Sequence, residues 1–246
     1  MHSNGREEWL KKPNIEYHER QFKNPYRSTV HFCDFLEEQN VMEQGKIIDI
    51  GAGLGANIKY MAERFSNISF TGIELNAHLV EIGNRFLRKE NINNCKLIQG
   101  DLYNLDNLFI EKFDGVVSYQ TLSWLPEYKT ALQKMIKLNP KWIGITSLFY
   151  EGPINTTILI QDYSQKVGEK PFLESYYNIY SLDLIEQLLT ENKFTIFKYK
   201  PFEIDIDLEQ PKTRRMGTYT IKTSEGKRLQ ISGPLLMSWY FVFASK

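Results

Sequence analysis

Three acidic residues and a set of glycines stand where they could bind a ligand that contains a nucleoside. Asp49 lies near the end of an apolar run, and three glycines follow it in the segment "IIDIGAGLG" at 47–55. Glu74 in "TGIELN" and Asp101 in "IQGDL" each come after a further apolar run. Glycine adopts positive φ and lets a ligand approach the backbone, because it has no Cβ. A carboxylate that ends the second strand of an α/β sheet can bind ribose hydroxyl groups. The pattern therefore predicts a ligand-binding loop with acids around it.

These residues need a framework that brings the ends of several strands to one edge. From about residue 45 onward, apolar runs of strand length alternate with segments of helical periodicity, which is typical of βαβ units and a parallel sheet. Helices are expected at 56–65, 77–91, 129–139 and 181–194, and strands at 47–50, 68–74, 95–100, 113–118, 142–148, 195–200 and 235–246. A hairpin that turns at Glu225-Gly226 is expected within 218–232. The predicted fold class is α/β with a doubly wound, mostly parallel sheet.

Length, charge and cysteine content exclude several classes of protein. The chain has 246 residues, 42% of them hydrophobic, and suits a single domain with additions. Lys and Arg total 30, as do Asp and Glu, so no net field attracts nucleic acid or an anionic membrane. No apolar stretch reaches the ~20 residues of a membrane span, and the first residues lack the apolar core of a signal peptide. Cys33 and Cys95 have no paired spacing, so neither a disulfide framework nor a metal site is indicated. We expect a cytoplasmic protein without nucleic-acid or membrane partners.

The ordered motifs resemble those of the class I S-adenosylmethionine-dependent methyltransferases. The segment "IIDIGAGLG" looks like their first motif, "GIELN" like the ribose-binding acid, "QGDL" like the adenine-side acid, and "FDGVVSYQTLSWLP" like the motif of the fourth strand. The resemblance covers about residues 44–148, and the ending "SWYFVFASK" suits the antiparallel last strand of that fold. It implies a Rossmann-like, seven-stranded sheet, S-adenosyl-L-methionine as cofactor and S-adenosyl-L-homocysteine as product.

The resemblance also implies a role at the cofactor for individual residues. Glu74 would accept hydrogen bonds from both ribose hydroxyls, and Asp101 would bind the adenine amine. The glycine loop would border the methionine part of the cofactor, and the end of the fourth strand would lie near the sulfonium. The residues expected at the cofactor are Asp49, Gly51, Ala52, Gly53, Gly55, Glu74, Leu75, Asp101, Leu102, Ser118 and Tyr119.

Two segments outside the alternating pattern are expected to cover a pocket. Residues 1–42 form the predicted N-terminal helical lid, and the tyrosine-rich residues 149–180 form an inserted cap after the carboxyl end of a strand, where open α/β sheets bind ligands. Residues 43–148 are the predicted cofactor-binding core, and 181–246 supply the C-terminal helix, strands and hairpin. Within the lid, Arg27 is predicted to pair with the cofactor's carboxylate, because a buried carboxylate needs a partner and guanidinium is well shaped for it.

The lid and the cap also contain the candidates for a general base. An alcohol acceptor needs such a base, because its pKa lies far above neutral. The candidate catalytic residues are His18, Glu151, Asp162 and Tyr163. A surface or packing role is the competing interpretation for each of them.

Two alternative functions remain open from the residues. Gly51, Gly53 and Ala56 also satisfy G-x-G-x-x-A, which would suit an NAD(P)- or flavin-binding oxidoreductase. Asp49 occupies a position that is usually apolar in dinucleotide-binding strands, and a pyrophosphate cofactor does not require Asp101; both observations count against this alternative. The other alternative is a protein that binds S-adenosylmethionine without catalysis.

The acceptor is inferred mostly by exclusion. The fourth strand is followed by "SYQT" rather than by the Asn/Asp-Pro-Pro-aromatic pattern that resembles enzymes methylating amide or exocyclic amine nitrogens. No Pro-Cys nucleophile of the cytosine-C5 type is present. We therefore expect a small polar acceptor, a sugar or another hydroxyl metabolite that is methylated on oxygen. The sequence does not indicate the oligomeric state.

Overall fold

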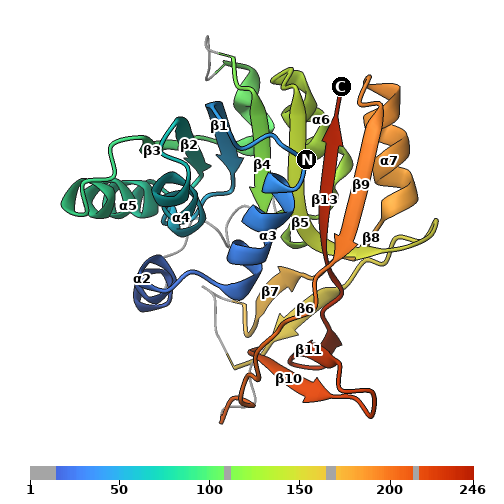
Figure 1. Ribbon diagram of the computed structural model, residues 1–246. Coiled ribbons are helices and arrows are strands. Elements are labelled where there is room, and N and C mark those ends of the chain that lie inside the picture. Colours follow the sequence, from blue (N-terminus) through green and yellow to red (C-terminus); the bar gives the residue numbers. More distant parts are fainter. Residues whose placement is uncertain (1–14, 108–111, 165–169, 213–215) are drawn as a thin grey trace.

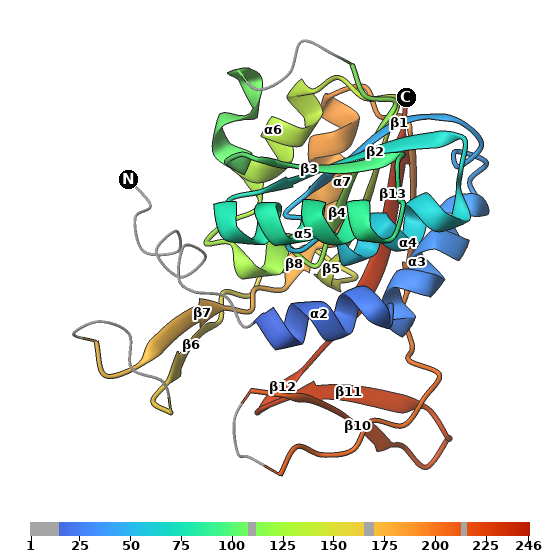
Figure 2. The same cartoon turned by 90° about the vertical axis from the view of Figure 1, so that its left-hand side faces the viewer.

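A central sheet with helices on both faces organises the molecule (Figures 1 and 2). The computed structural model describes residues 15–107, 112–164, 170–212 and 216–246. The strands of the central sheet are β1 (Gly45–Ile50), β2 (Ile68–Glu74), β3 (Cys95–Gln99), β4 (Gly115–Tyr119), β5 (Trp142–Tyr150), β8 (Tyr180–Ser181), β9 (Ile196–Pro201) and β13 (Trp239–Ser245). The helices are α2 (Ile15–Lys23), α3 (Arg27–Glu37), α4 (Ala56–Arg64), α5 (Ala77–Lys89), α6 (Lys129–Lys137) and α7 (Leu182–Glu191), with short 3-10 helices η1 (Leu102–Asn107) and η2 (Leu122–Trp124).

The strand order confirms the predicted sheet. Seven strands follow one another as β3-β2-β1-β4-β5-β13-β9, and the short β8 adds an eighth beside β5. The first five strands of this path are parallel, and β13 runs antiparallel between β5 and β9. The chain therefore has the doubly wound, mostly parallel sheet with an antiparallel last strand that the motifs imply.

Side-chain alternation along β1 explains how the sheet separates two hydrophobic cores. Ile47 packs with side chains of α3, α4 and α5, whereas Ile48 and Ile50 pack with side chains of α6 and α7. Successive side chains of a strand point to opposite faces, so Asp49 shares the face of Ile47. Asp49 thus enters the apolar core on the side of α4, the helix that follows the glycine loop.

The carboxyl ends of the parallel strands meet at one edge of the sheet. Ile50 is paired with Ile73 in β2, and Glu74 is paired with Gln99 in β3, so the residues that follow β1, β2 and β3 lie close together. Figures 1 and 2 show α2, a hairpin and a small sheet gathered at this end of the molecule. The hairpin consists of β6 (Leu159–Asp162) and β7 (Leu173–Tyr176), and the small sheet of β10 (Thr218–Lys222), β11 (Arg228–Ser232) and β12 (Leu235–Leu236).

The C-terminal elements agree with the sequence except at their boundaries. Ser181 caps α7 as predicted, because its side chain accepts a hydrogen bond from the Leu184 N–H. The hairpin of β10 and β11 turns at Gly226, whose φ is +81°. The expected single strand at 235–246 is instead divided into β12 and β13, and β12 pairs with β11.

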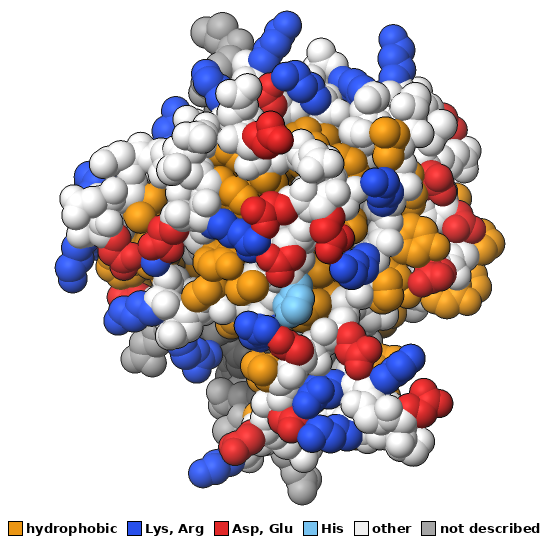
Figure 3. Space-filling view, viewed as in Figure 1, with side chains coloured by type: hydrophobic (Ala, Val, Ile, Leu, Met, Phe, Trp, Pro, Cys, Tyr) orange, Lys and Arg blue, Asp and Glu red, His pale blue; other side chains and the backbone are white. Residues whose placement is uncertain are grey.

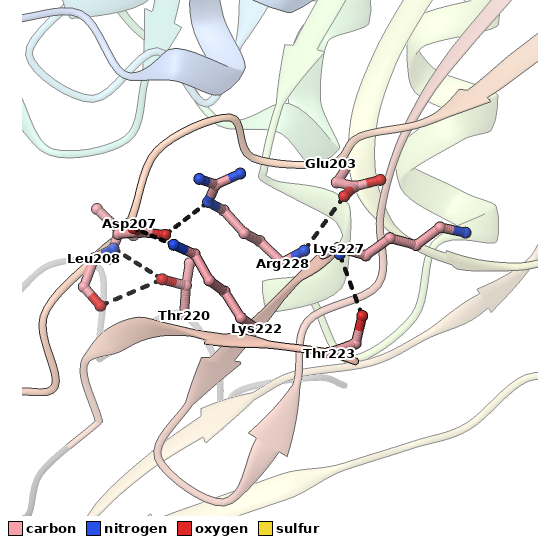
Figure 4. Close-up of polar contacts among 8 residues, drawn as sticks. All are labelled: Glu203, Asp207, Leu208, Thr220, Lys222, Thr223, Lys227 and Arg228. Atoms are coloured by element: carbon pink, nitrogen blue, oxygen red, sulfur yellow. Dashed lines mark hydrogen bonds and ion pairs between the residues drawn. The ribbon is translucent and has the colours of Figure 1, made fainter. Parts of the chain in front are cut away.

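The segment after β9 is bound to the polar side of the small sheet. Asp207 pairs with Lys222 and with Arg228, and the Leu208 N–H donates to the Thr220 hydroxyl at 2.8 Å (Figure 4). The Arg228 N–H donates to Glu203 at 3.3 Å. These contacts hold the small sheet against the end of β9. Within the described ranges, no helix combines the length and the apolar character that crossing a membrane requires.

Candidate functional site

The glycine loop follows β1 in a conformation that suits glycine. Gly51, Gly53 and Gly55 have φ of +83°, +55° and +87°, the left-handed region that other residues rarely adopt. A Cβ on Gly51 would lie 2.4 Å from the Thr121 hydroxyl oxygen, so the loop packs directly on the segment after β4. The N–H groups of Gly51 and Ala52 both donate to the Ile73 carbonyl at 2.9 Å, which ties the loop to β2. The loop backbone is thus fixed between β2 and the segment after β4.

Glu74 is fixed beside this loop at the end of β2. Its Oε2 accepts a hydrogen bond from the Gly53 N–H at 2.9 Å, and its Oε1 accepts one from the Asn76 N–H at 2.8 Å. Burial raises the pKa of the Glu74 carboxyl, whereas the backbone hydrogen bonds lower it. Each carboxylate oxygen can accept a further hydrogen bond, so the pair of ribose hydroxyls expected from the motif could both be accommodated.

Asp49 is a fully buried carboxyl that lacks a hydrogen-bond partner. Its exposed fraction is 0%, and among the described residues neither carboxylate oxygen receives a hydrogen bond. Burial, with a further contribution from the charge of Glu74, raises the pKa of Asp49 to about 7. A buried carboxylate without a partner is costly. A cationic ligand at the loop would offset that cost, and this fits a cofactor with an ammonium and a sulfonium group.

Asp101 and its neighbours form the next part of the same edge. Asp101 follows β3 and accepts hydrogen bonds from the Tyr103 N–H at 3.0 Å and from Asn104 Nδ2 at 3.2 Å. Asp101 therefore stands directly before η1. Leu102, the first residue of η1, is partly buried against the hydrophobic core on the side of α6 and α7. Leu75 directly follows β2 and is partly exposed. These residues continue the edge of the sheet that begins at Glu74, in the order that the motifs imply.

The end of β4 is bonded to the end of β1. The Ser118 hydroxyl donates to the Ile50 carbonyl at 3.1 Å, and the Thr121 hydroxyl donates to the same carbonyl at 3.2 Å. Tyr119, also predicted here, points to the other side of β4 and donates its hydroxyl hydrogen to Ser28 of α3 at 2.6 Å. Burial raises the pKa of this phenol far above its usual value. The sequence motifs did not indicate Thr121, because its contacts with Gly51 and with the Ile50 carbonyl form only when the chain folds.

The lid reaches the glycine loop through His18. A Cβ placed on Gly53 would lie 3.7 Å from Cε1 and 3.8 Å from Nδ1 of this imidazole. His18 is on α2 and is half-buried, and burial lowers its pKa. Of the predicted lid, residues 1–14 lie outside the described residues.

Arg27 begins α3 but is engaged by a residue that the sequence did not indicate. Its Nε donates to Oδ1 of Asp205 at 2.8 Å, its Nη2 contacts Oδ2, and its side chain is 40% exposed. The neighbouring guanidinium holds the pKa of Asp205 well below its usual range. His31 Nε2 lies 3.5 Å from the same carboxylate. The proposed pairing of Arg27 with the cofactor's carboxylate stays a prediction, and it would require Arg27 to leave Asp205.

The three candidate bases of the cap have other described partners. Glu151 accepts a hydrogen bond from the Tyr240 hydroxyl at 3.0 Å, and Asp162 accepts one from the Ser164 N–H at 2.9 Å. Tyr163 is 67% exposed and its ring packs on Phe172. None of these contacts is with the glycine loop, so a catalytic role for these residues stays a prediction.

The cap is anchored to the segment after β4 by a residue that sequence reasoning missed. Asn178 is fully buried, its Nδ2 donates to the Leu125 carbonyl at 2.8 Å, and its Oδ1 accepts from the Ile158 N–H at 2.9 Å. Next to it, the Trp124 ring lies 4.4 Å from the Tyr177 ring, centroid to centroid. Aromatic side chains therefore stand close to where the chain leaves β4.

The described ranges hold no group of three or more His, Cys, Asp or Glu side chains placed to bind a metal ion.

Comparison with known sequences points to one domain type. Residues 47–139 match the family model described as a methyltransferase domain. An uncharacterized protein of Rickettsia prowazekii is 30% identical over 109 residues, which are 43% of this chain and 43% of that protein. The fatty-acid O-methyltransferase of Mycolicibacterium smegmatis is 26% identical over 46% of this chain and 39% of its own length. The release factor glutamine methyltransferase of Fusobacterium nucleatum is 29% identical over 63% of this chain and 43% of its own length. This chain thus covers less than half the length of these relatives.

A solved structure shares the fold over almost the whole chain. Magnesium protoporphyrin IX methyltransferase from Synechocystis, with bound S-adenosylhomocysteine, gives a TM-score of 0.53 with 11% identity and covers 96% of this chain and 89% of its own. At that identity the likeness concerns the fold alone.

Proposed function

We propose that this chain, whose residues 47–139 form a class I S-adenosylmethionine-dependent methyltransferase domain, methylates a small polar acceptor on oxygen. A sugar or another hydroxyl metabolite is the acceptor class that we favour. The alternatives, a nicotinamide or flavin oxidoreductase and a cofactor-binding protein without catalysis, receive no support from the family match.

The observation that carries the proposal is the pair of acids at the glycine loop. Glu74 is oriented by two backbone N–H groups, which suits a carboxylate that accepts from ribose hydroxyls. Asp49 is a buried acid without a described hydrogen-bond partner, which suits a cationic ligand. S-adenosylmethionine has both features, whereas a dinucleotide would bring the negative pyrophosphate toward Asp49.

The residues of the chain would act mainly by binding and orientation. When bound, the cofactor supplies the activated methyl group on its sulfonium. The glycine loop, Glu74 and Asp101 would hold the cofactor, and the end of β4 with Trp124 would border the acceptor. Placement of the acceptor in line with the methyl group and exclusion of water are the main contributions that such a site makes.

Among the four candidate bases, His18 is the one that the geometry supports best. It lies against Gly53, is half-buried, and has a lowered pKa, so it is neutral near pH 7 and can accept a proton. A proton taken from an acceptor hydroxyl would reside on the imidazole during transfer.

The proposed partner is a small molecule, and the proposed location is the cytoplasm. On the face shown in Figure 3, acidic and basic side chains are interspersed, which does not favour a polyanion. Cys33 and Cys95 are free and buried, and burial raises the pKa of each thiol to about 12. Two inert thiols suit a reducing compartment.

Three measurements test this proposal. Calorimetry should show binding of S-adenosylhomocysteine and no binding of nicotinamide dinucleotides. Labelled S-adenosylmethionine, offered with panels of sugars, phenols, carboxylic acids and amines, should give a methylated product only where a hydroxyl is present. His18→Gln should lower kcat by about 100-fold, while His78→Gln, an exposed control on α5, should leave it unchanged. Tight dinucleotide binding, or methylation confined to amines, would overturn the proposal.

A further inference from the structure

Four polar side chains from three elements form a buried chain of contacts behind the glycine loop. The Thr29 hydroxyl donates to Oδ1 of Asn57 at 2.8 Å and lies 3.1 Å from the Tyr119 hydroxyl, which donates to Ser28 at 2.6 Å. All four residues are buried, and Thr29 has an exposed fraction of 0%. We call this set the hydroxyl cluster (Ser28, Thr29, Asn57 and Tyr119).

The hydroxyl cluster links its three elements through three contacts between buried polar groups. Thr29 donates its hydroxyl hydrogen to Asn57 and Tyr119 donates its own to Ser28, so these two bonds each have a hydrogen, and Thr29 lies in polar contact with Tyr119. In a low-dielectric interior such a network is rigid, and leaving one member without its partner is costly. Apolar side chains of similar volume could fill the same space. These polar contacts therefore serve to set the relative position of the three elements more than to stabilise the fold.

The three elements that meet here are those that surround the cofactor site. Ser28 and Thr29 lie in the first turn of α3, and Asn57 lies in the first turn of α4, two positions after Gly55. Tyr119 ends β4. The cluster thus ties the base of the lid to the helix of the glycine loop and to the strand end near the sulfonium position.

The position of α2 depends on this attachment. Only residues 24–26 connect α2 to α3, so a displaced α3 would carry α2 with it. α2 also packs on the core through the buried Phe22, whose ring contacts Phe86 of α5, and it places His18 against Gly53. The hydroxyl cluster therefore fixes the start of α3, while α2 is held by its apolar contacts and meets the loop with His18.

We propose that Thr29 is a positioning residue that fixes the register of the lid over the glycine loop, and through it the affinity for the cofactor. This inference rests on the proposed function, because it assumes that the loop binds S-adenosylmethionine. Thr29 would not touch the cofactor; it would act through Asn57 on the loop helix and through α3 on His18.

The test compares three variants in the full chain. Thr29→Val removes the hydroxyl at nearly constant volume, Thr29→Ser keeps it, and Thr71→Val makes the same change at a buried threonine in β2. In Thr29→Val we expect about tenfold weaker binding of S-adenosylhomocysteine and about tenfold faster hydrogen exchange in residues 15–23. Thr29→Ser should restore both values, and Thr71→Val should change neither.

A further variant distinguishes an effect on the lid from a general loss of stability in Thr29→Val. Tyr119→Phe removes the other hydroxyl of the Thr29 contact and should speed exchange in residues 15–23 in the same way. If Thr29→Val and Tyr119→Phe lower the melting temperature while binding and exchange stay at the parent values, the cluster is merely structural and the inference is wrong. The exchange measurement needs no cofactor. Parent protein that fails to bind S-adenosylhomocysteine would therefore refute the proposed function, while the exchange data would still decide whether Thr29 fixes the lid.

Discussion

The backbone N–H of Gly53 donates a hydrogen bond to Oε2 of Glu74 at 2.9 Å, although the two residues are 21 positions apart in the chain. The bond joins the loop after β1 to the end of β2. With the bond from the Asn76 N–H to Oε1, it fixes both oxygens of the carboxylate before any ligand arrives. A group that is already oriented loses little conformational freedom on binding, so more of its interaction energy appears as affinity.

Replacement of Glu74 should therefore weaken cofactor binding strongly. In Glu74→Ala, two hydroxyl contacts to a charged group would be lost, which corresponds to ~1.5 to 3 kcal/mol of binding free energy. Calorimetry with S-adenosylhomocysteine measures this loss. Glu81→Ala, an exposed acid on α5, serves as the control and should bind like the parent. Equal affinity of the parent and Glu74→Ala would show that this acid does not bind ribose.

A side chain at Gly53 should block the same site. Gly53→Val adds a branched Cβ in the left-handed region and on the side of His18, so we expect loss of cofactor binding with the fold retained. Strain alone would cost ~1 to 2 kcal/mol of folding free energy. Gly226→Val is a matched control, because its φ is +81° and no atom lies within 4 Å of the added Cβ. If both variants bind S-adenosylhomocysteine normally, the loop is only a turn.

The meeting of the candidate site residues at one edge of the sheet could be predicted from the sequence because its signals are local. The apolar run that contains Asp49, the glycines after it and the acid Glu74 each follow from a few consecutive residues and from strand order. Parallel strands place their carboxyl ends at one edge, so predicting the strands also predicted that these residues meet. The sheet order and the antiparallel β13 confirm that inference.

The surroundings of the site could not be predicted, because they depend on contacts between distant residues. Arg27 was expected at the cofactor for its charge, but its partner Asp205 lies 178 positions away. Asn178 and Thr29 are ordinary polar residues in the sequence, and only the fold shows that each is buried in a hydrogen-bond network. The short β8 and β12 have two residues each, too few for a periodic pattern.

Asp49 should make the stability of the cofactor-free protein depend on pH. Its pKa is about 7 in the folded protein, against a usual value of 3.8, so between these values the folded state retains a proton that the unfolded state releases. Stability should then fall as the pH rises through this window, because the folded state binds more protons. From pH 5 to pH 8 the loss would be on the order of 2 to 3 kcal/mol.

The comparison with Asp49→Asn isolates this effect from other titrating groups. The asparagine variant is uncharged at every pH, so its free energy of unfolding in urea should decline less between pH 5 and pH 8 than that of the parent. Parallel pH profiles for the two proteins would mean that ionisation of Asp49 does not lower the free energy of unfolding. The argument that its buried charge favours a cationic ligand would then be lost.

The last prediction concerns the competition between Asp205 and the cofactor for Arg27. Arg27 stands at the start of α3, where a helix N-terminus and a guanidinium would together favour a carboxylate. In the structure it pairs with Asp205 instead, and that pair is exposed, so separating it costs little. If Arg27 binds the cofactor's carboxylate, Arg27→Met should weaken binding of S-adenosylhomocysteine by about tenfold and leave 5′-methylthioadenosine, which lacks the carboxylate, unaffected. Asp205→Asn should tighten binding of the first ligand alone, because it releases the guanidinium, and Arg20→Met, a basic residue of α2, should alter neither affinity. Equal losses for both ligands in Arg27→Met, or no loss for either, would leave Arg27 as a residue that only joins α3 to the segment after β9.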